Sequence, residues 1–203
     1  YTDKNILEDI NLDIYQGDFL LITGPNGGGK TSLLRTILRL QSPTKGRISF
    51  FRQGEPVSSL DMGYLPQKNS IDSRFPITVE EVVASGLMGN TQKGNTKFDS
   101  KKEIDEMLDL MGITALRNKP IGVLSGGQLQ RSLFGRALIS KPEMLILDEP
   151  ASYIDRQFGN RMFEILRDLS SNGTTIMMVS HEIEPFITLS NRNLYINHIL
   201  GDR

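Results

Sequence analysis

The chain has 203 residues, with 23 basic and 24 acidic side chains and a formal net charge of −1, which gives no electrostatic case for nucleic acid as its main partner. It contains no cysteine, which excludes a disulfide framework and a thiolate metal site. The length fits one ordinary globular domain, residues 1–203, and apolar runs such as Met144–Leu147 are far too short to span a bilayer.

Three apolar runs predict strands that are buried on both faces, as in a parallel sheet: Phe19–Thr23, Met144–Leu147 and Thr175–Val179. A loop rich in Gly, Pro, Asp or Ser follows each run, and a helical pattern follows the loop. In open α/β sheets, ligands bind where the strands end at their carboxyl edge. The order of elements therefore predicts an α/β fold with its functional loops at that edge.

The remaining stretches predict smaller elements around this sheet. Alternating apolar residues at Ile10–Tyr15 and Arg47–Phe51 favour an antiparallel edge sheet. Residues 78–91 and 99–118 have helical patterns, and an exposed loop is expected at Gln92–Asn95. No internal repeat or interdomain linker is evident, which again favours a single domain.

The loop after the first strand fits the phosphate-binding pattern G-x-x-x-x-G-K-[ST]. Its glycines let the backbone curl so that N–H groups converge on phosphate oxygens, and the helix that follows adds its dipole. A glycine-rich turn that happens to precede a helix is the alternative, but a strand before and a helix after favour nucleotide binding. The predicted nucleotide-binding residues are Gly24, Pro25, Asn26, Gly27, Gly28, Gly29, Lys30, Thr31 and Ser32. Among them, Lys30 supplies a positive charge and the Thr31 hydroxyl a ligand for Mg²⁺.

Two adjacent carboxylates, Asp148 and Glu149, end the second apolar strand and precede Pro150. Adjacent strand residues point in opposite directions, so we expect Asp148 to face Mg²⁺, through water, and Glu149 to face the attacking water as a general base. Alone, this tripeptide is more often a solvated turn. After a buried strand in a protein with a phosphate loop, the functional interpretation is favoured.

Two single side chains follow other strands. Gln67 comes after a short strand, Met62–Leu65, and its amide would suit Mg²⁺, although a lone glutamine is ordinarily just a surface residue. His181 follows the third apolar strand, beside the expected position of the terminal phosphate, where an imidazole would donate a hydrogen bond. The alternative for His181 is a capping or solvated histidine. The only other histidine, His198, has no comparable setting.

A second helix start, Leu124–Gln128, is also suited to phosphate although it lies far along the chain from the first loop. Ser125 is a good N-cap, Gly126 and Gly127 leave room for a ligand, and the helix N-terminus attracts anions. One nucleotide needs only one phosphate loop, so this element suggests a site assembled from two copies of the chain. An ordinary capped helix is the alternative.

Together these motifs resemble the ATP-binding cassette (ABC) ATPases over the whole chain and in the family's order. The corresponding motifs are Walker A (Gly24–Thr31), the Q-loop (Gln67), the signature (Leu124–Gln128), Walker B (Met144–Glu149), the D-loop (Ser152–Asp155) and the switch histidine (His181). The resemblance implies a P-loop NTPase fold, in which helices flank a mainly parallel sheet and an antiparallel β edge subdomain accompanies a helical subdomain. The nucleotide-binding core would be residues 1–67 and 136–203, and the helical subdomain residues 68–135.

The resemblance also implies the roles of the site residues. Glu149, His181 and Lys30 would be catalytic, Tyr1 would stack on the adenine of ATP, and Mg²⁺ would be held by Thr31, Gln67 and Asp148. Two copies would face each other head to tail, so that each signature motif serves the partner's ATP, with Asp155 in the D-loop between them. The signature residues concerned are Ser125, Gly126, Gly127 and Gln128. Tyr153 and Ile154 are bulkier than the family's usual D-loop residues.

Such a cassette resembles the ATPase subunit of a multi-subunit importer on the cytoplasmic face of the cell membrane. Its partners would be an integral membrane permease and a substrate-binding protein. The stretches Phe75–Val83 and Gly86–Gly89 resemble the zinc/manganese and iron-chelate branches. The alternatives are an ABC ATPase of translation or nucleic-acid repair, and a non-hydrolysing binding module. The chain has one cassette and no room for a long coiled coil, which disfavours a translation or repair ATPase. The presence of Glu149 and His181 disfavours a non-hydrolysing binding module.

Overall fold

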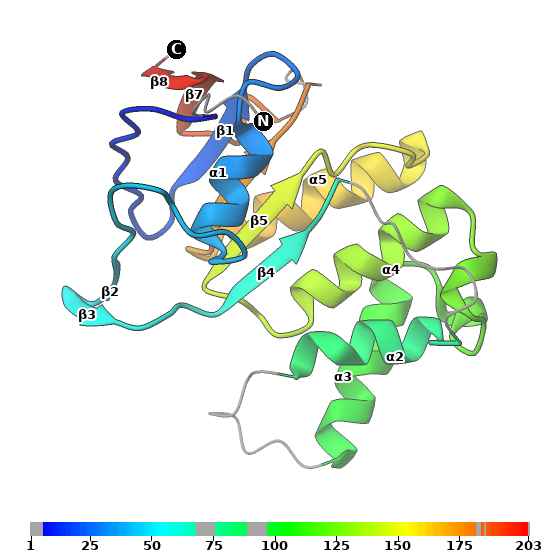
Figure 1. The fold of residues 1–203 in the computed structure, drawn as a ribbon. Helices are drawn as coiled ribbons and strands as arrows, with labels where there is room; N and C mark the ends of the chain where they lie inside the picture. Colours follow the sequence, from blue (N-terminus) through cyan, green and yellow to red (C-terminus); the bar gives the residue numbers. More distant parts are fainter. Residues whose placement is uncertain (1–5, 68–75, 89–96, 182–183, 185, 203) are drawn as a thin grey trace.

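The computed structural model describes residues 6–67, 76–88, 97–181, 184 and 186–202 (Figure 1). Its main sheet has six strands, five of them parallel, and the last strand is antiparallel to its neighbour. In spatial order the strands are β4 (Met62–Leu65), β5 (Met144–Asp148), β6 (Thr175–Val179), β1 (Phe19–Thr23), β7 (Arg192–Asn197) and β8 (Ile199–Asp202). The three strands predicted from apolar runs are confirmed, and they are adjacent at the centre of the sheet.

The central strands are buried on both faces because a different hydrophobic cluster covers each face. Alternate residues such as Leu20 and Ile146 pack with helix α1 (Lys30–Ile37) on one face. Their neighbours Leu21 and Leu145 pack in the second cluster, on the other face. This arrangement is why these strands lack an alternating polar pattern.

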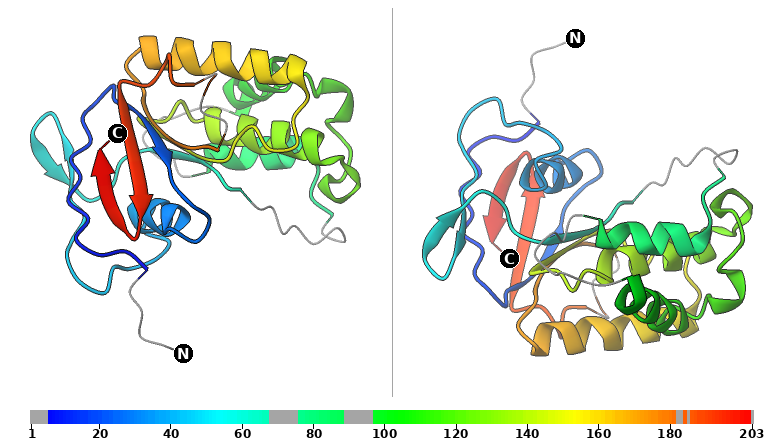
Figure 2. Two further views of the ribbon diagram at one scale, coloured as in Figure 1. Left: turned by 90° about the horizontal axis from the view of Figure 1, so that it is seen from above. Right: turned by 90° about the horizontal axis from the view of Figure 1, so that it is seen from below.

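The second cluster is built by four helices. They are α2 (Val79–Ala84), α3 (Lys97–Leu110), α4 (Gly126–Leu138) and α5 (Arg156–Ser171). Three short 3₁₀ turns connect them, at Ser85–Leu87, Thr114–Leu116 and Ile121–Val123. Figures 1 and 2 show α2, α3 and α4 gathered at one side of the molecule, away from β7 and β8. None of the described helices combines the length and apolar character that a membrane span requires.

The predicted antiparallel edge sheet is only partly right. A two-stranded antiparallel sheet exists, but its strands are β2 (Phe50–Arg52) and β3 (Glu55–Val57), and residues 10–15 form no described strand. The alternation at 10–15 is nevertheless real, since Ile10, Leu12 and Ile14 pack against the cluster around α1. Apolar alternation reports burial of one side of an extended segment, and it does not require a hydrogen-bonded partner strand.

The two predicted helices are shorter than expected, and a glycine lies just beyond the end of each. Helix α3 stops at Leu110 because Gly112 adopts a left-handed φ of 65°, and 3₁₀ structure replaces the rest of the predicted span. Helix α2 gives way to a 3₁₀ turn at Gly86, where an added Cβ would lie 2.1 Å from the carbonyl oxygen of Arg136 in α4. The loop predicted at 92–95 lies outside the described residues.

The packing of β5 leads to a stability prediction. Leu145 is fully buried between β4 and β6, so Leu145→Ala should lower the free energy of unfolding by about 2–5 kcal/mol through lost burial and a cavity. Equilibrium urea unfolding measures this loss. The matched control is Leu40→Ala, because that leucine is 66% exposed and should change stability by no more than about 0.5 kcal/mol. Equal effects of the two substitutions would contradict the described core.

Candidate active site

The predicted site residues meet at one edge of the sheet because the strands that carry them are parallel. The phosphate loop follows β1, Asp148 ends β5, and His181 lies just after β6. Gln67 follows β4, which pairs in parallel with β5. All four strands therefore end at the same carboxyl edge, as expected from the order of elements.

The phosphate loop has the curled backbone that its glycines predict, with φ values of 141° at Gly24, 80° at Gly27 and 99° at Gly29. Two of these glycines also meet a tertiary requirement. A Cβ on Gly24 would lie 2.0 Å from the carbonyl oxygen of Ile196 in β7, and one on Gly29 would lie 2.4 Å from the Leu7 side chain. The loop is thus enclosed from behind, and only its outer side is left for a ligand.

Lys30 is the first residue of α1 and is only 7% exposed. Its ammonium donates hydrogen bonds to the carbonyl oxygens of Gly24 and Pro25, both at 2.9 Å. These carbonyls hold the positive charge against the loop itself. The arrangement suits an anion that approaches the same backbone.

Thr31 and Asp148 are joined by a hydrogen bond of 2.9 Å, in which the threonine hydroxyl donates to Oδ2 of the aspartate. Asp148 is 1% exposed, and its second oxygen, Oδ1, is buried without a hydrogen-bond partner. Burial raises the pKa of Asp148, and the hydrogen bond from Thr31 opposes this rise. A buried carboxylate oxygen with no donor is suited to a cation.

Glu149 and His181 form the second pair at this edge. Their Oε1 and Nε2 atoms lie 3.0 Å apart, and the Glu149 side chain is the more buried of the two. Strand alternation does not set the direction of Glu149, because β5 ends at Asp148 and Glu149 has a left-handed φ of 53°. Its backbone N–H donates to the carbonyl oxygen of Val179 at 2.9 Å, which fixes this turn against β6. The left-handed backbone of Glu149 and this hydrogen bond together place its side chain beside His181.

The two remaining predicted residues for this edge are Gln67 and Tyr1. Gln67 lies two residues beyond β4 with an exposed side chain, so it is at the predicted edge. Tyr1, the predicted adenine-stacking residue, lies outside the described residues.

The second helix start has the predicted N-cap. The Ser125 hydroxyl accepts a hydrogen bond from the N–H of Gln128 at 3.3 Å, and Gln128 Oε1 accepts one from the N–H of Ser125 at 3.1 Å. This is a capping box, so the Gln128 side chain satisfies its own helix end. Ser125 and Gly126 are exposed, and the start of α4 lies apart from α1 in every view (Figure 2). The two phosphate-suited elements therefore do not form one site within a single copy of the chain.

The predicted D-loop contacts this helix start. Gly127 accommodates the loop, since an added Cβ would lie 2.8 Å from the carbonyl oxygen of Tyr153. Tyr153 itself is 80% exposed, with a φ of 69°. Asp155 caps α5 by accepting the N–H of Phe158 at 2.9 Å, and it forms an ion pair with Arg131 of α4. The backbone hydrogen bond and the guanidinium both lower the pKa of the Asp155 carboxyl.

Comparison with known protein families identifies the family to which this fold belongs. Residues 7–152 match the family described as ABC transporter. The chain belongs to the ABC transporter family.

Relatives and solved structures agree with this assignment over nearly the whole chain. A metal transport system ATP-binding protein of Chlamydia pneumoniae is 40% identical, and the match covers 97% of this chain and 81% of the relative. Zinc uptake system ATP-binding protein ZurA of Listeria monocytogenes is 37% identical, with 99% and 78% covered. A dimeric ATP-binding cassette bound to ADP and Pi after hydrolysis shares the fold with a TM-score of 0.82 and 25% identity, with 97% of this chain and 90% of that chain covered.

The protein is accordingly an ABC ATPase that binds and hydrolyses ATP. The expected P-loop NTPase fold is confirmed by the sheet and by these neighbours. The alternatives of a translation or repair ATPase and of a non-hydrolysing module receive no support from these relatives.

Two residues near the site escaped the sequence analysis. Arg131 lies with its guanidinium carbon 4.5 Å from the centroid of the Phe158 ring, besides pairing with Asp155. Gln130 is 3% exposed and donates to the carbonyl oxygen of Pro150 at 3.3 Å, which ties α4 to the turn after Glu149. Neither residue stands out by spacing. Their partners lie more than one element away along the chain, and only the fold brings them together.

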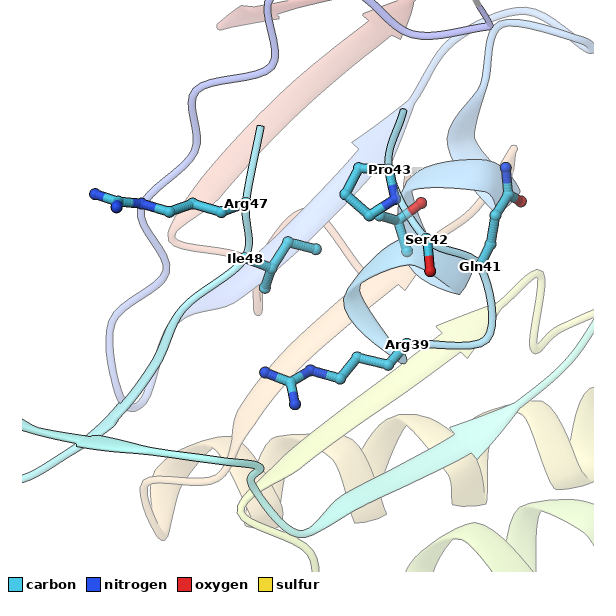
Figure 3. A pocket seen from close by; sticks show the side chains of 7 residues that line it. Arg39, Gln41, Ser42, Pro43, Arg47 and Ile48 are labelled. Atoms are coloured by element: carbon cyan, nitrogen blue, oxygen red, sulfur yellow. The ribbon is translucent and has the colours of Figure 1, made fainter. Parts of the chain in front are cut away.

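One cavity of about 320 Å³ lies at the far end of α1 from the phosphate loop (Figure 3). Two arginines line it, but the Arg39 guanidinium lies 4.8 Å from the Phe50 ring centroid and Arg47 is directed away from Ser42 and Pro43. The cavity takes no part in the site at the carboxyl edge.

Proposed function

We propose that this chain is the ATP-hydrolysing subunit of a metal-ion importer, with zinc as the favoured cargo, and that it drives a separate membrane permease. The single observation that carries the proposal is the meeting of the phosphate loop, Asp148 and the Glu149–His181 pair at one edge, in a chain whose similar relatives are named for zinc or metal transport. In this proposal the subunit works on the cytoplasmic face of the membrane. A substrate-binding protein would deliver the cargo to the permease.

The residues at the edge fit Mg²⁺. The Thr31 hydroxyl and the Gln67 amide would supply hard oxygen ligands, and the buried, partnerless Oδ1 of Asp148 would hold the ion through water. When bound, Mg²⁺ would neutralise charge on the phosphates. Lys30 would hold the same phosphates from the side of the loop, together with the backbone N–H groups of Gly24–Ser32.

The Glu149–His181 pair supplies the proton chemistry in this proposal. Water attacks the terminal phosphorus, the Glu149 carboxylate takes the proton from that water, and the bond between the phosphorus and the oxygen of ADP breaks. His181 holds Glu149 through the 3.0 Å contact and is exposed enough to reach a phosphate oxygen. Inorganic phosphate and ADP leave.

Two copies of the chain would complete each site. The exposed start of α4 with Ser125, Gly126 and Gly127 would close on the ATP of a head-to-tail partner, and Asp155 would lie at the same interface. Three observations support this: the separation of α4 from α1, the exposure of the cap, and the dimeric cassettes of similar fold (Figure 2). The capping box leaves Gln128 a supporting role through its side chain, and its backbone N–H is already taken by Ser125.

The helices α2, α3 and α4 would form the subdomain that receives the permease. Their grouping at one side of the molecule supports a division into a nucleotide-binding core, residues 1–67 and 136–203, and a helical part, residues 68–135, with the boundary falling within α4. Because α4 begins within the signature, directly after its N-cap Ser125, a push on this subdomain would be transmitted to the nucleotide.

Transport in reconstituted vesicles tests the function. The chain is purified in complex with a metal-ion permease and placed in proteoliposomes with the ATPase outside and the substrate-binding protein and zinc inside. We expect zinc transport that requires both ATP and Mg²⁺, and ATP hydrolysis that rises when the permease is present. Manganese and an iron chelate serve as competing cargo. A rate of ATP hydrolysis that is unchanged by the permease but raised by ribosomes or DNA would contradict the proposal.

A further inference from the structure

His198 occupies the turn between β7 and β8 and uses three polar groups to join two other segments. Its N–H donates to the carbonyl oxygen of Gly28 at 3.0 Å, and its own carbonyl oxygen accepts the N–H of Glu8 at 2.8 Å. Its ring Nδ1 lies 2.9 Å from the carbonyl oxygen of Ile6. Since a carbonyl only accepts, Nδ1 must carry the proton in this contact. One residue thus connects the phosphate loop to the segment 6–8.

The backbone of His198 is in the left-handed region, with a φ of 66°. Glycine adopts this conformation most easily, and asparagine is the side-chain-bearing residue most tolerant of it. Histidine is, with asparagine and aspartate, among the side-chain-bearing residues enriched in this region, so the turn itself accommodates it. What this histidine adds to the turn is the ring contact to Ile6.

The two joined segments touch each other at the loop. Gly29, which caps α1, faces the Leu7 side chain so closely that an added Cβ would lie 2.4 Å from it. Behind the loop, the Ile196 carbonyl meets Gly24 and Gly28 in the same way, at 2.0 and 2.8 Å. The phosphate loop is therefore held between β7 and the segment 6–8. His198, directly after β7, forms the hydrogen bonds that join β7 to this segment.

We propose that His198 is a positioning residue for nucleotide binding, which holds the segment 6–8 against the phosphate loop and so presets the loop for a nucleoside triphosphate. The inference rests on the proposed assignment of Gly24–Ser32 as the phosphate site. Preorganisation lowers the cost of binding, so the loss of the ring contact should appear in affinity. The chemical step, carried out at the ends of β5 and β6, should change little.

Two substitutions isolate the ring contact. His198→Gly suits the left-handed turn and keeps both backbone hydrogen bonds, but it removes the donor to Ile6. His198→Asn also tolerates the turn and places an amide N–H at the position of Nδ1, attached to the same Cγ. We expect the glycine variant to raise KM for ATP by about three- to tenfold with kcat within about twofold, and the asparagine variant to stay near the parent protein.

Two control variants and one further measurement complete the test. Ile199→Thr, at the neighbouring exposed position, is the matched control and should leave KM unchanged. Hydrogen exchange should speed up at residues 6–8 in His198→Gly, and this is readable even if turnover is lost. Lys30→Ala should abolish ATP binding.

An error in the role of His198 and an error in the assignment of the phosphate site would give different results. If Lys30→Ala binds ATP normally, the phosphate site itself is wrong. If Lys30→Ala loses binding while His198→Gly keeps its KM and its exchange pattern, only the role of His198 is wrong. Equal defects in the glycine and asparagine variants would also overturn the role, because the asparagine retains the donor.

Discussion

Glu149→Gln is expected to lower the rate of ATP hydrolysis by about 10²–10⁴-fold while ATP still binds. The substitution removes the carboxylate that takes the proton from water. It preserves the size of the side chain and leaves an amide that can still contact His181. In the parent protein, His181 Nε2 lies 3.0 Å from Glu149 Oε1. Because ATP would persist in the closed site, the variant should accumulate as a dimer. Phosphate release measures the rate, and size-exclusion chromatography with ATP and Mg²⁺ measures the dimer.

Glu55→Gln is the matched control for this experiment, since Glu55 is an exposed carboxylate in β3. It should hydrolyse ATP at the parent rate and remain in the parent's oligomeric state. A Glu149→Gln protein that turned over ATP within a fewfold of the parent would show that another group takes the proton. Dimers that formed equally with ADP would show that association does not depend on an unhydrolysed nucleotide.

Ser125→Asp should lower ATPase activity by about 100-fold or more while the fold and the ATP affinity of the single copy are kept. Aspartate is as good an N-cap as serine, so it can accept the N–H of Gln128 and leave α4 intact. Its negative charge, however, would face the phosphates of the partner's ATP and oppose closure. Thermal unfolding, ATP titration and phosphate release together separate these effects.

Ser125→Thr provides the uncharged control, because it keeps the cap and a hydroxyl. It should retain much of the activity and the stability of the parent. If Ser125→Asp instead destroyed ATP binding in the single copy, the α4 start would serve the same copy's nucleotide. An unchanged ATPase rate would place Ser125 outside the nucleotide interface.

The sequence correctly predicted that the phosphate loop, Asp148 and His181 lie at one sheet edge, because the determinants of that edge are local. A buried parallel strand, a glycine loop and a helix start are each encoded within about ten residues, and parallel strands must end at a common edge. The placement of Lys30, Thr31, Asp148 and His181 follows from this rule alone. The N-cap at Ser125 was readable for the same reason, since a capping box spans four positions.

Predictions from the sequence were wrong or missing where a feature depends on a contact between residues far apart along the chain. Residues 10–15 were predicted to be a strand, but their apolar side packs on the α1 cluster without a ladder. The end of α3 was missed because it depends on the left-handed turn at Gly112, and Gly86 just after α2 lies against the backbone of α4. Arg131 and His198 were assigned no task, because their partners Asp155 and Ile6 are not near them in sequence.

Patterns within single segments predict an α/β fold with its phosphate loop, carboxylates and histidine at one sheet edge, and the order of the motifs predicts an ABC ATPase. Local backbone preferences and short-range spacing carry that information. Three further features appear only in the folded chain: a left-handed backbone turns Glu149 to meet His181, the Tyr153 carbonyl lies against Gly127, and His198 joins the phosphate loop to the segment 6–8. These contacts depend on how distant segments pack against each other, and no short pattern in the chain encodes them.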